Sequence, residues 1–425
     1  MVRLSGAGVV DVARKILKPV PSRAGHATRC DVHEDQTRID EVVAVMYHAP
    51  RSFTGEDMLE ITTHGGSVVP RAVLATVVRA GARMAAPGEF TRRAVLNGKL
   101  DLLQAEAVAD LIDARSTAAH RMALQQLDGG LSRRVALLRE ELLALEALLA
   151  YDIDFPEEDD GPVPRVRIDE ATQHLKASLG ALLATSTRAS LVRDGALVVM
   201  AGAPNAGKSS LFNALLGEAR AIVTEIPGTT RDAIEAVLDV PGWPLRLVDT
   251  AGLRETAEPV ERLGIETATR YLHRAAVILH CIDARDEHAA RHAALDDVPG
   301  EVLVVRTKAD LVTNRTKITG EHAVSAVTGE GLRALLETIE RHVAGASGQP
   351  DLDNPSLTSA RHEVAVRHAS DELNAFLDAW EHNTLPAIVA ATHVRTAAHA
   401  LGELIGAVEV DDVLDVVFRT FCVGK

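Results

Sequence analysis

A glycine-rich loop that ends in a lysine and a serine is the first feature of this sequence with the residue types needed for chemistry. Residues 202–209 read Gly-Ala-Pro-Asn-Ala-Gly-Lys-Ser, after an apolar run and before a helical segment. Glycines let backbone N–H groups approach phosphate oxygens, and a helix N-terminus adds positive partial charge. We expect Lys208 to meet the outer phosphate and the Ser209 hydroxyl to ligate Mg²⁺. A chance Gly-rich loop is the alternative.

Two downstream motifs have the spacing needed to surround a γ-phosphate and its Mg²⁺. Asp249-Thr-Ala-Gly252 ends an apolar run, which places a carboxylate in the outer sphere of Mg²⁺ and a glycine amide near the γ-phosphate. Gly228-Thr-Thr-Arg-Asp232 lies between this motif and the phosphate loop, where Thr230 is expected to ligate Mg²⁺ only while the γ-phosphate is bound. A plain surface turn is the alternative for the second motif, and its position favours the switch role.

Two short motifs indicate that the base is guanine. Thr307-Lys-Ala-Asp310 closes another apolar run, and the Asp310 carboxylate can accept hydrogen bonds from both N1 and N2 of guanine. Adenine cannot supply both, and the unpaired buried carboxylate would then cost about 1–3 kcal/mol. We expect Lys308 to lie along the base plane and Ser325-Ala326 to present a backbone amide to guanine O6.

The group that assists hydrolysis is not evident from the motifs. Ras-type enzymes place a water-orienting glutamine directly after the Asp-x-x-Gly glycine, and Leu253 has that position here. Arg231 and Arg254 are candidate cations for the developing phosphate charge, with a merely solvated loop arginine as the alternative for each. A monovalent metal is a further option, because Asn205 offers a side-chain carbonyl and residues 222–230 offer backbone oxygens. Asn205 has the alternative role of stabilising its own turn.

Apolar runs between these motifs predict the domain that positions them. The runs are Ala196–Ala201, Leu245–Asp249, Ala275–Asp283 and Glu301–Thr307. Strands buried on both faces of a parallel sheet have such continuous apolar character, whereas strands with one wet face alternate. Alternation with helical segments therefore predicts a doubly wound α/β domain over residues 193–345.

The remaining segments predict an α+β domain and a helical domain. Residues 1–98 contain β-like runs at Glu41–Met46 and Met58–Thr62 and a helical stretch at Val69–Ala80. Residues 99–192 and 346–425 are helical, so the α/β domain is inserted into a helical domain. Tyr151–Pro164 is expected to be a loop, and a connector runs from about Val343 to Pro355. Leucines expected near one helix face are Leu137, Leu138, Leu142, Leu145 and Leu149.

Composition narrows the class of protein. The chain has 425 residues, a net charge of −15, 47% hydrophobic and 25% charged residues, so it is globular and any contact with nucleic acid needs a local basic patch or a second protein. Cys30, Cys281 and Cys422 have no disulfide or zinc spacing. No apolar run approaches the ~20 residues that span a bilayer, so we expect a soluble cytoplasmic protein without membrane contact.

Motifs along nearly the whole chain resemble those of the MnmE (TrmE) family of tRNA-modification GTPases. The most specific are the terminal pentapeptide Phe421–Lys425 and the Gly-Thr-Thr-Arg-Asp loop combined with Pro-Asn-Ala-Gly-Lys-Ser. The other matching segments are Ser52–Asp57, His64–Gly66, Pro87–Thr91 and Leu100–Glu106.

The resemblance implies a Ras-like P-loop GTPase domain that depends on K⁺ in place of an arginine finger. It also implies a homodimer that forms through the N-terminal domain and, on GTP binding, through the nucleotide domains. By match to the family pattern, Glu261 would orient water, although composition alone makes it an ordinary helix-surface acid. Thr230 and Lys208 would complete the catalytic set. Ser209 and Thr230 would hold Mg²⁺, and the K⁺ ligands would be Asn205, Thr224, Ile226 and Thr229.

The GTP contacts expected from the motifs and the resemblance together lie in five segments. They are Asn205, Ala206, Gly207, Lys208, Ser209, Ser210, Thr224, Glu225, Ile226, Pro227, Gly228, Thr229, Thr230, Asp249, Thr250, Ala251, Gly252, Lys308, Asp310, Ser325 and Ala326.

The resemblance further implies work on tRNA with the flavoprotein MnmG, in a heterotetramer-type complex. The reaction would add an aminomethyl-type group at carbon 5 of the wobble uridine, with a one-carbon unit from 5-formyl- or 5,10-methylene-tetrahydrofolate. FAD and NADH would belong to the partner. Folate contacts would be Arg3, Glu60, Lys99 and Lys425, for which ordinary surface charge is the alternative. Cys422 would be a reactive tail thiol or simply packed, and packing is favoured.

Two departures from the family pattern and two rival functions remain. The family begins with one further strand and a Gly-rich loop before Arg-Leu-Ser-Gly, so an incomplete folate pocket is an expectation. Thr307 replaces the commoner Asn of the guanine motif. The rival functions are a ribosome-assembly GTPase acting as an RNA-binding switch, which normally brings a basic RNA-binding domain, and a folate-binding regulator without a modification role.

Overall fold

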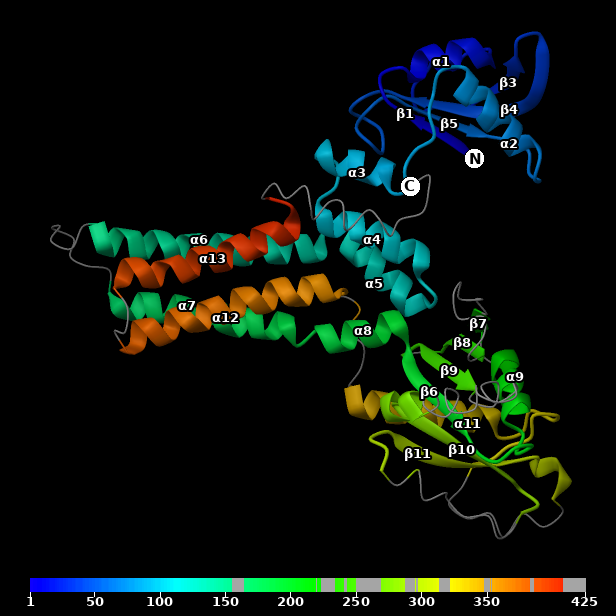
Figure 1. The fold of residues 1–425 in the computed structure, drawn as a ribbon, viewed down its shortest axis with the longest axis vertical. Coiled ribbons are helices and arrows are strands. Elements are labelled where there is room, and N and C mark those ends of the chain that lie inside the picture. The colour runs from blue at the N-terminus through cyan, green and yellow to red at the C-terminus, as the bar shows by residue number, and fades with distance from the viewer. Residues whose placement is uncertain are drawn as a thin grey trace, which may run out of the picture. The chain divides into compact units, whose positions relative to one another are not determined.

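The computed structural model falls into two compact units (Figure 1). It describes residues 1–154, 164–218, 220–222, 234–240, 243–249, 269–286, 295, 297–312, 322–347, 352, 354–382 and 386–407. The first unit comprises Met1–Ala109, Gln126–Ala150 and Ile388–Lys425, and the second comprises Asp110–Gln125 and Tyr151–Ala387.

The first unit begins with an antiparallel sheet of five strands in the order β1-β5-β4-β3-β2. Its helices cover apolar strand residues such as Val32, Ala44 and Ile61, which are fully buried. The elements are β1 (Val2–Ser5), α1 (Val9–Ile16), β2 (Leu17–Lys18), β3 (Thr28–Glu34), β4 (Thr37–Tyr47), β5 (Met58–Thr62), α2 (Val69–Arg79) and α3 (Glu89–Leu96). The expected α+β character of this part is confirmed.

Long helices follow the sheet. Those mainly in the first unit are α4 (Leu102–Asp113), α6 (Gly130–Asp154) and α13 (Ala387–Ile405), and those mainly in the second are α5 (Thr117–Leu127), α7 (Arg165–Leu183), α8 (Ser186–Asp194) and α12 (Ala360–His382). Within that unit α7 and α12 lie side by side (Figure 1).

Two sequence expectations about α6 need correction. Leu138, Leu142, Leu145 and Leu149 are buried, whereas 46% of Leu137 is exposed. Positions 138, 142, 145 and 149 follow the helical repeat and share one face, while position 137 is rotated away from it by about 100°. Tyr151–Asp154, expected in a loop, form the last turn of α6. Residues 155–163 lie outside the described residues.

The second unit contains a seven-stranded sheet in the order β12-β11-β10-β6-β9-β8-β7. The strands are β6 (Ala196–Ala201), β7 (Arg220–Ile222), β8 (Ile234–Asp239), β9 (Leu245–Asp249), β10 (Val277–Asp283), β11 (Glu301–Thr307) and β12 (His322–Ala323). The four apolar runs of the sequence form β9, β6, β10 and β11, which are parallel neighbours as predicted. The ladder of β10 begins at Val277 rather than at Ala275.

Apolar residues cover both faces of this sheet. Val198 belongs to a core that includes Leu211 of α9 (Lys208–Glu218) and Leu335 of α11 (Leu332–Ser347), whereas Val199 belongs to a second core, on which Tyr271 packs. Side chains on both faces of β6 are therefore buried, which explains why the strand is apolar without interruption. Among the described residues, none of the helices combines the length and apolar character that a bilayer crossing requires.

Candidate functional site

The loop between β6 and α9 has a backbone that only certain residues adopt. Gly202 has φ +146° and Gly207 has φ +83°, and Asn205 has φ +61° in the left-handed region. A Cβ built on Gly202 would lie 2.3 Å from the carbonyl oxygen of Cys281 on β10. The glycine at 202 is thus required by both conformation and space, and it lets the loop turn back over the sheet edge.

Lys208 opens α9, and its side chain is buried beneath this loop. The Lys208 Nζ donates to the carbonyl oxygens of Gly202 at 3.0 Å and Ala203 at 2.8 Å, and 6% of the residue is exposed. An ammonium group at the N-terminus of a helix, enclosed by a glycine-containing loop, is the arrangement expected of a phosphate site.

Ser209 and Asp249, each of which the sequence analysis expects near Mg²⁺, are hydrogen-bonded to each other. The Ser209 hydroxyl donates to Asp249 Oδ2 at 2.7 Å. Asp249 ends β9, pairs with Met200 of the neighbouring strand and is 1% exposed. The pair supplies a hydroxyl oxygen and a carboxylate oxygen, the hard donors that Mg²⁺ prefers.

The Thr307 side chain connects the guanine motif to the phosphate loop. Thr307 ends β11 and is 3% exposed, and its hydroxyl donates to the carbonyl oxygen of Ala206 at 2.6 Å. The carbonyl oxygen of Ile282 on β10 lies 3.2 Å from the same hydroxyl. Threonine at this position therefore links the end of β11 to both the phosphate loop and β10, which the sequence alone did not indicate.

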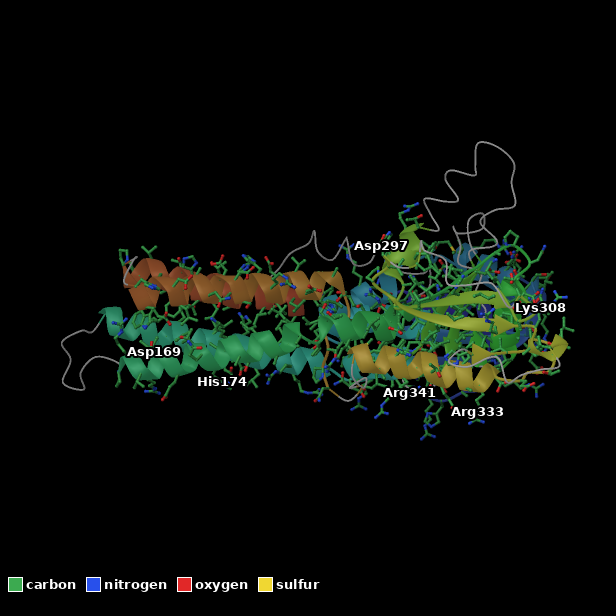
Figure 2. The ribbon with its side chains drawn as sticks, turned by 90° about the horizontal axis from the view of Figure 1, so that it is seen from below. Asp169, His174, Asp297, Lys308, Arg333 and Arg341 are labelled. Carbon is green, nitrogen blue, oxygen red and sulfur yellow. The ribbon has the colours of Figure 1, made fainter. Side chains whose placement is uncertain are left out.

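Lys308, which is labelled in Figure 2, follows Thr307 directly. Its backbone lies in the left-handed region, with φ +58°. Its Nζ donates to the carbonyl oxygen of Asn205 at 2.8 Å and to Asp283 Oδ2 at 2.9 Å. Arg285 also binds Asp283, and its hydrogen bonds are the main cause that holds the pKa of Asp283 well below its usual range, with Lys308 adding to the effect.

Asp310 lies in the short helix Ala309–Leu311 and accepts a hydrogen bond from Ser325 Oγ at 2.6 Å. Ser325 is fully buried, and its hydroxyl also accepts the backbone N–H of Thr328 at 3.1 Å. The Ala309 N–H donates to the Val324 carbonyl at 3.1 Å. The two expected base-contacting motifs are thus brought together, and Ser325 orients the Asp310 carboxylate.

Several expected site residues lie outside the described residues. They are Thr224, Glu225, Ile226, Pro227, Gly228, Thr229, Thr230, Thr250, Ala251, Gly252 and Glu261, together with Leu253, Arg231, Arg254, Cys422 and Lys425. Their assigned roles stay predictions.

Two of the expected folate residues bind each other. Arg3 on β1 and Glu60 on β5 are register partners, and their side chains form an ion pair at 2.7 Å. Tyr47 donates to the second Glu60 oxygen at 3.4 Å, and burial is the main cause that raises the pKa of its phenol. Lys99 is separate and donates to the carbonyl oxygen of Pro50 at 3.2 Å.

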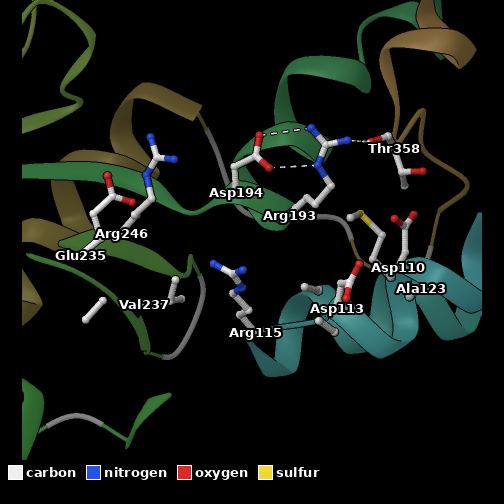
Figure 3. Close-up of a pocket in the computed structure, with 14 residues that line it drawn as sticks. Asp110, Asp113, Arg115, Ala123, Arg193, Asp194, Glu235, Val237, Arg246 and Thr358 are labelled. Carbon is white, nitrogen blue, oxygen red and sulfur yellow. Dashed lines mark hydrogen bonds and ion pairs between the residues drawn. The ribbon is translucent and has the colours of Figure 1, made fainter. Parts of the chain in front are cut away.

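A cavity of about 390 Å³ lies elsewhere in the second unit (Figure 3). Its wall includes Arg115 near the end of α4, Arg193 and Asp194 at the end of α8, and Arg246 of β9. Near it, Asp239 of β8 accepts the Thr117 N–H at 3.0 Å and the Thr117 hydroxyl at 2.6 Å. Of the described residues that line the cavity, none belongs to the motifs of the phosphate or guanine site.

Comparisons with known proteins cover almost the whole chain. Residues 1–99 match the family model described as GTP-binding protein TrmE N-terminus, and residues 102–422 match that described as MnmE helical domain. The chain is 43% identical to the tRNA modification GTPase MnmE of Heliobacterium modesticaldum, covering 100% of this chain and 96% of that protein. It is 41% identical to the protein of the same name from Aquifex aeolicus, with the same coverage.

Proposed function

The chain belongs to the MnmE family of tRNA-modification GTPases, and on that premise we propose that its GTPase depends on K⁺ and acts with a flavoprotein on the wobble uridine of tRNA. GTP hydrolysis and a role in tRNA modification are properties of the family. The finer proposal is a change at carbon 5 of U34 to (carboxymethyl)aminomethyluridine. The observation that carries it is the match over both the N-terminal and the helical domain.

The described residues fit GTP and Mg²⁺. Lys208 and the backbone of the loop would hold the phosphates, Ser209 would ligate Mg²⁺, and Asp310 would accept N1 and N2 of guanine. Thr230, which lies outside the described residues, is proposed as the second protein ligand of Mg²⁺. Bound Mg²⁺ would neutralise phosphate charge. The Ser325 hydrogen bond fixes the Asp310 carboxylate before GTP binds, which reduces the ordering that binding requires.

Asn205 supports the proposal of a K⁺ site. Its left-handed backbone, with φ +61°, is restrained by the hydrogen bond that its carbonyl accepts from Lys308 at 2.8 Å. A restrained asparagine within the phosphate loop suits a cation next to the phosphates, with Thr224, Ile226 and Thr229 as further ligands. Potassium would supply the positive charge of an arginine finger, and Glu261 would orient the attacking water.

The K⁺ proposal is tested by measuring GTP turnover at constant ionic strength in KCl and in NaCl. We expect turnover at least tenfold faster in KCl, about the contribution of 1.4 kcal/mol to the barrier. Replacing Asn205 by Ala should remove most of the difference. Equal rates of the unsubstituted protein in the two salts would contradict the proposal.

We also propose a tetrahydrofolate site in the first unit and a homodimer that binds MnmG, with FAD and NADH on that partner, in the cytoplasm. Arg3 and Glu60 would contribute charged groups of fixed geometry, because each already holds the other. Lys99 and Lys425 would add positive charge for the glutamate end of folate. The test is calorimetric titration of 5-formyltetrahydrofolate into the chain and into a form without Lys425, which should bind at least tenfold more weakly. No binding to the full chain would contradict the folate proposal.

The matched domains disfavour the alternative of a ribosome-assembly switch. Such a GTPase normally carries a basic RNA-binding domain, whereas residues 1–99 and 102–422 match domains of the TrmE and MnmE models. The formal charge of −15 agrees with tRNA being held largely by the partner.

A further inference from the structure

Asp283, which no sequence motif includes, lies between two cations at the end of β10. Its Oδ2 accepts hydrogen bonds from Lys308 Nζ at 2.9 Å and from the Arg285 guanidinium at 2.7 Å. Its Oδ1 accepts the backbone N–H and Nε of Arg285, each at 3.0 Å. With 20% of its side chain exposed, Asp283 is more buried than an ordinary surface ion pair.

Lys308 extends this arrangement to the phosphate loop. Both Lys308 and Asn205 have left-handed backbones, with φ +58° and +61°. The Lys308 Nζ binds the Asn205 carbonyl oxygen and Asp283 at once. Asp283, Lys308 and Asn205 therefore form one continuous chain of hydrogen bonds, which we call the lysine clamp, from β10 through the guanine motif to the phosphate loop.

The position of the acid follows from the register of the sheet. Asp283 pairs with Thr307 across the parallel strands β10 and β11, so its carboxylate lies beside the residue that precedes Lys308. A Cβ on Gly207 would lie 3.7 Å from Lys308 Cε, which shows that the lysine stem passes directly over the phosphate loop. Without Asp283, the ammonium group would keep the Asn205 carbonyl but lose its ion pair with this carboxylate, and the neighbouring Arg285 would repel it.

We propose that Asp283 is a positioning residue of the nucleotide site, which fixes Lys308 in the place where its stem contacts the guanine plane. A flexible lysine side chain would otherwise lose rotamer freedom when the nucleotide binds. Arg285 braces the acid from the solvent side. The inference rests on the proposed contact of Lys308 with the base.

The test is the dissociation rate of a fluorescent methylanthraniloyl-GDP, measured by stopped flow with excess GDP, in the full chain. Asp283→Asn should speed release about tenfold, the effect of losing one charge-assisted hydrogen bond. Lys308→Ala should speed release at least as much. The double variant should release no faster than Lys308→Ala, because the acid acts through the lysine.

Control variants separate this role from general stabilisation. Glu337→Gln removes the acid of an exposed ion pair with Arg333 on α11 and should leave the release rate unchanged. Asp283→Glu keeps the charge and should recover most of the slow release.

Three outcomes would overturn the inference. They are a release rate of Asp283→Asn within twofold of the unsubstituted protein, an equal effect of Asp283→Asn in the presence and absence of Lys308, or no recovery by Asp283→Glu. Unchanged release from Lys308→Ala would instead contradict the proposed base contact itself, so the two failures are distinguishable.

Discussion

Replacement of Thr307 by Val tests whether a single hydroxyl joins the guanine motif to the phosphate loop. The change keeps the shape of the side chain but removes the donor to the Ala206 carbonyl, at 2.6 Å, and places a methyl group there. Because Thr307 is 3% exposed, water cannot take over the bond. Leaving a buried carbonyl without this donor costs about 1–3 kcal/mol. We expect the free energy of unfolding of the nucleotide domain to fall by about 2 kcal/mol.

The assay is urea unfolding followed by the fluorescence of Trp243, which is 1% exposed in the core of this domain. The chain has two tryptophans, so Trp380→Phe in all variants makes Trp243 the sole reporter. Thr338→Val is the matched control, because Thr338 donates within its own helix to Ala334 at 2.9 Å and such bonds add little stability. A loss for Thr307→Val no greater than that of the control would refute the reasoning.

Two further predictions concern contacts outside the nucleotide site. Hydrogen bonds from Arg83 are the main cause that lowers the pKa of Glu89 from 4.5 to about 2. The contribution of the Glu89 carboxylate to stability is therefore present above pH 4.5 and is lost as the pH falls towards 2. The gap in unfolding free energy between Glu89→Gln and the unsubstituted chain, on the order of 1–2 kcal/mol after screening, should therefore narrow across that range, and a constant gap would contradict it. Thr117→Val removes the hydroxyl that donates to Asp239 at 2.6 Å and should speed amide exchange in the first turn of α5 about threefold. Unchanged exchange would show that this hydrogen bond does not stabilise the start of the helix.

Four strands of the central sheet could be predicted from the sequence because each of them is a largely apolar run. Strands covered on both faces must be apolar throughout, and three of the four predicted runs coincide with β6, β9 and β11. The fourth began two residues early, since Ala275 is buried but lies outside the ladder of β10. Burial can be read from residue type, whereas strand pairing depends on the neighbouring strand.

The residues of the candidate site also differ in how far the sequence could reveal them. Ser209, Asp249, Asp310 and Ser325 belong to short motifs that are recognisable in the sequence, and the structure brings Ser209 to Asp249 and Ser325 to Asp310. Asp283 could not be predicted from sequence alone, because it belongs to no motif and only the register of β10 and β11 brings it beside Lys308. Its sole signal was an acid at the end of an apolar run.

Hydrogen bonds join the expected guanine motif to the expected phosphate loop. Thr307 and Lys308 each bond a carbonyl of the phosphate loop, at Ala206 and Asn205. A shift of residues 307–308 would therefore be transmitted to the loop of residues 202–209, and the reverse is equally true. Because the coupling between two bound ligands is reciprocal in free energy, a link between guanine binding at Lys308 and cation binding at Asn205, both as proposed, would act in both directions. If turnover depends on K⁺ as proposed, variants of the lysine clamp should for this reason alter both nucleotide release and the K⁺ concentration for half-maximal turnover, and an effect on release alone would show that the two loops move independently.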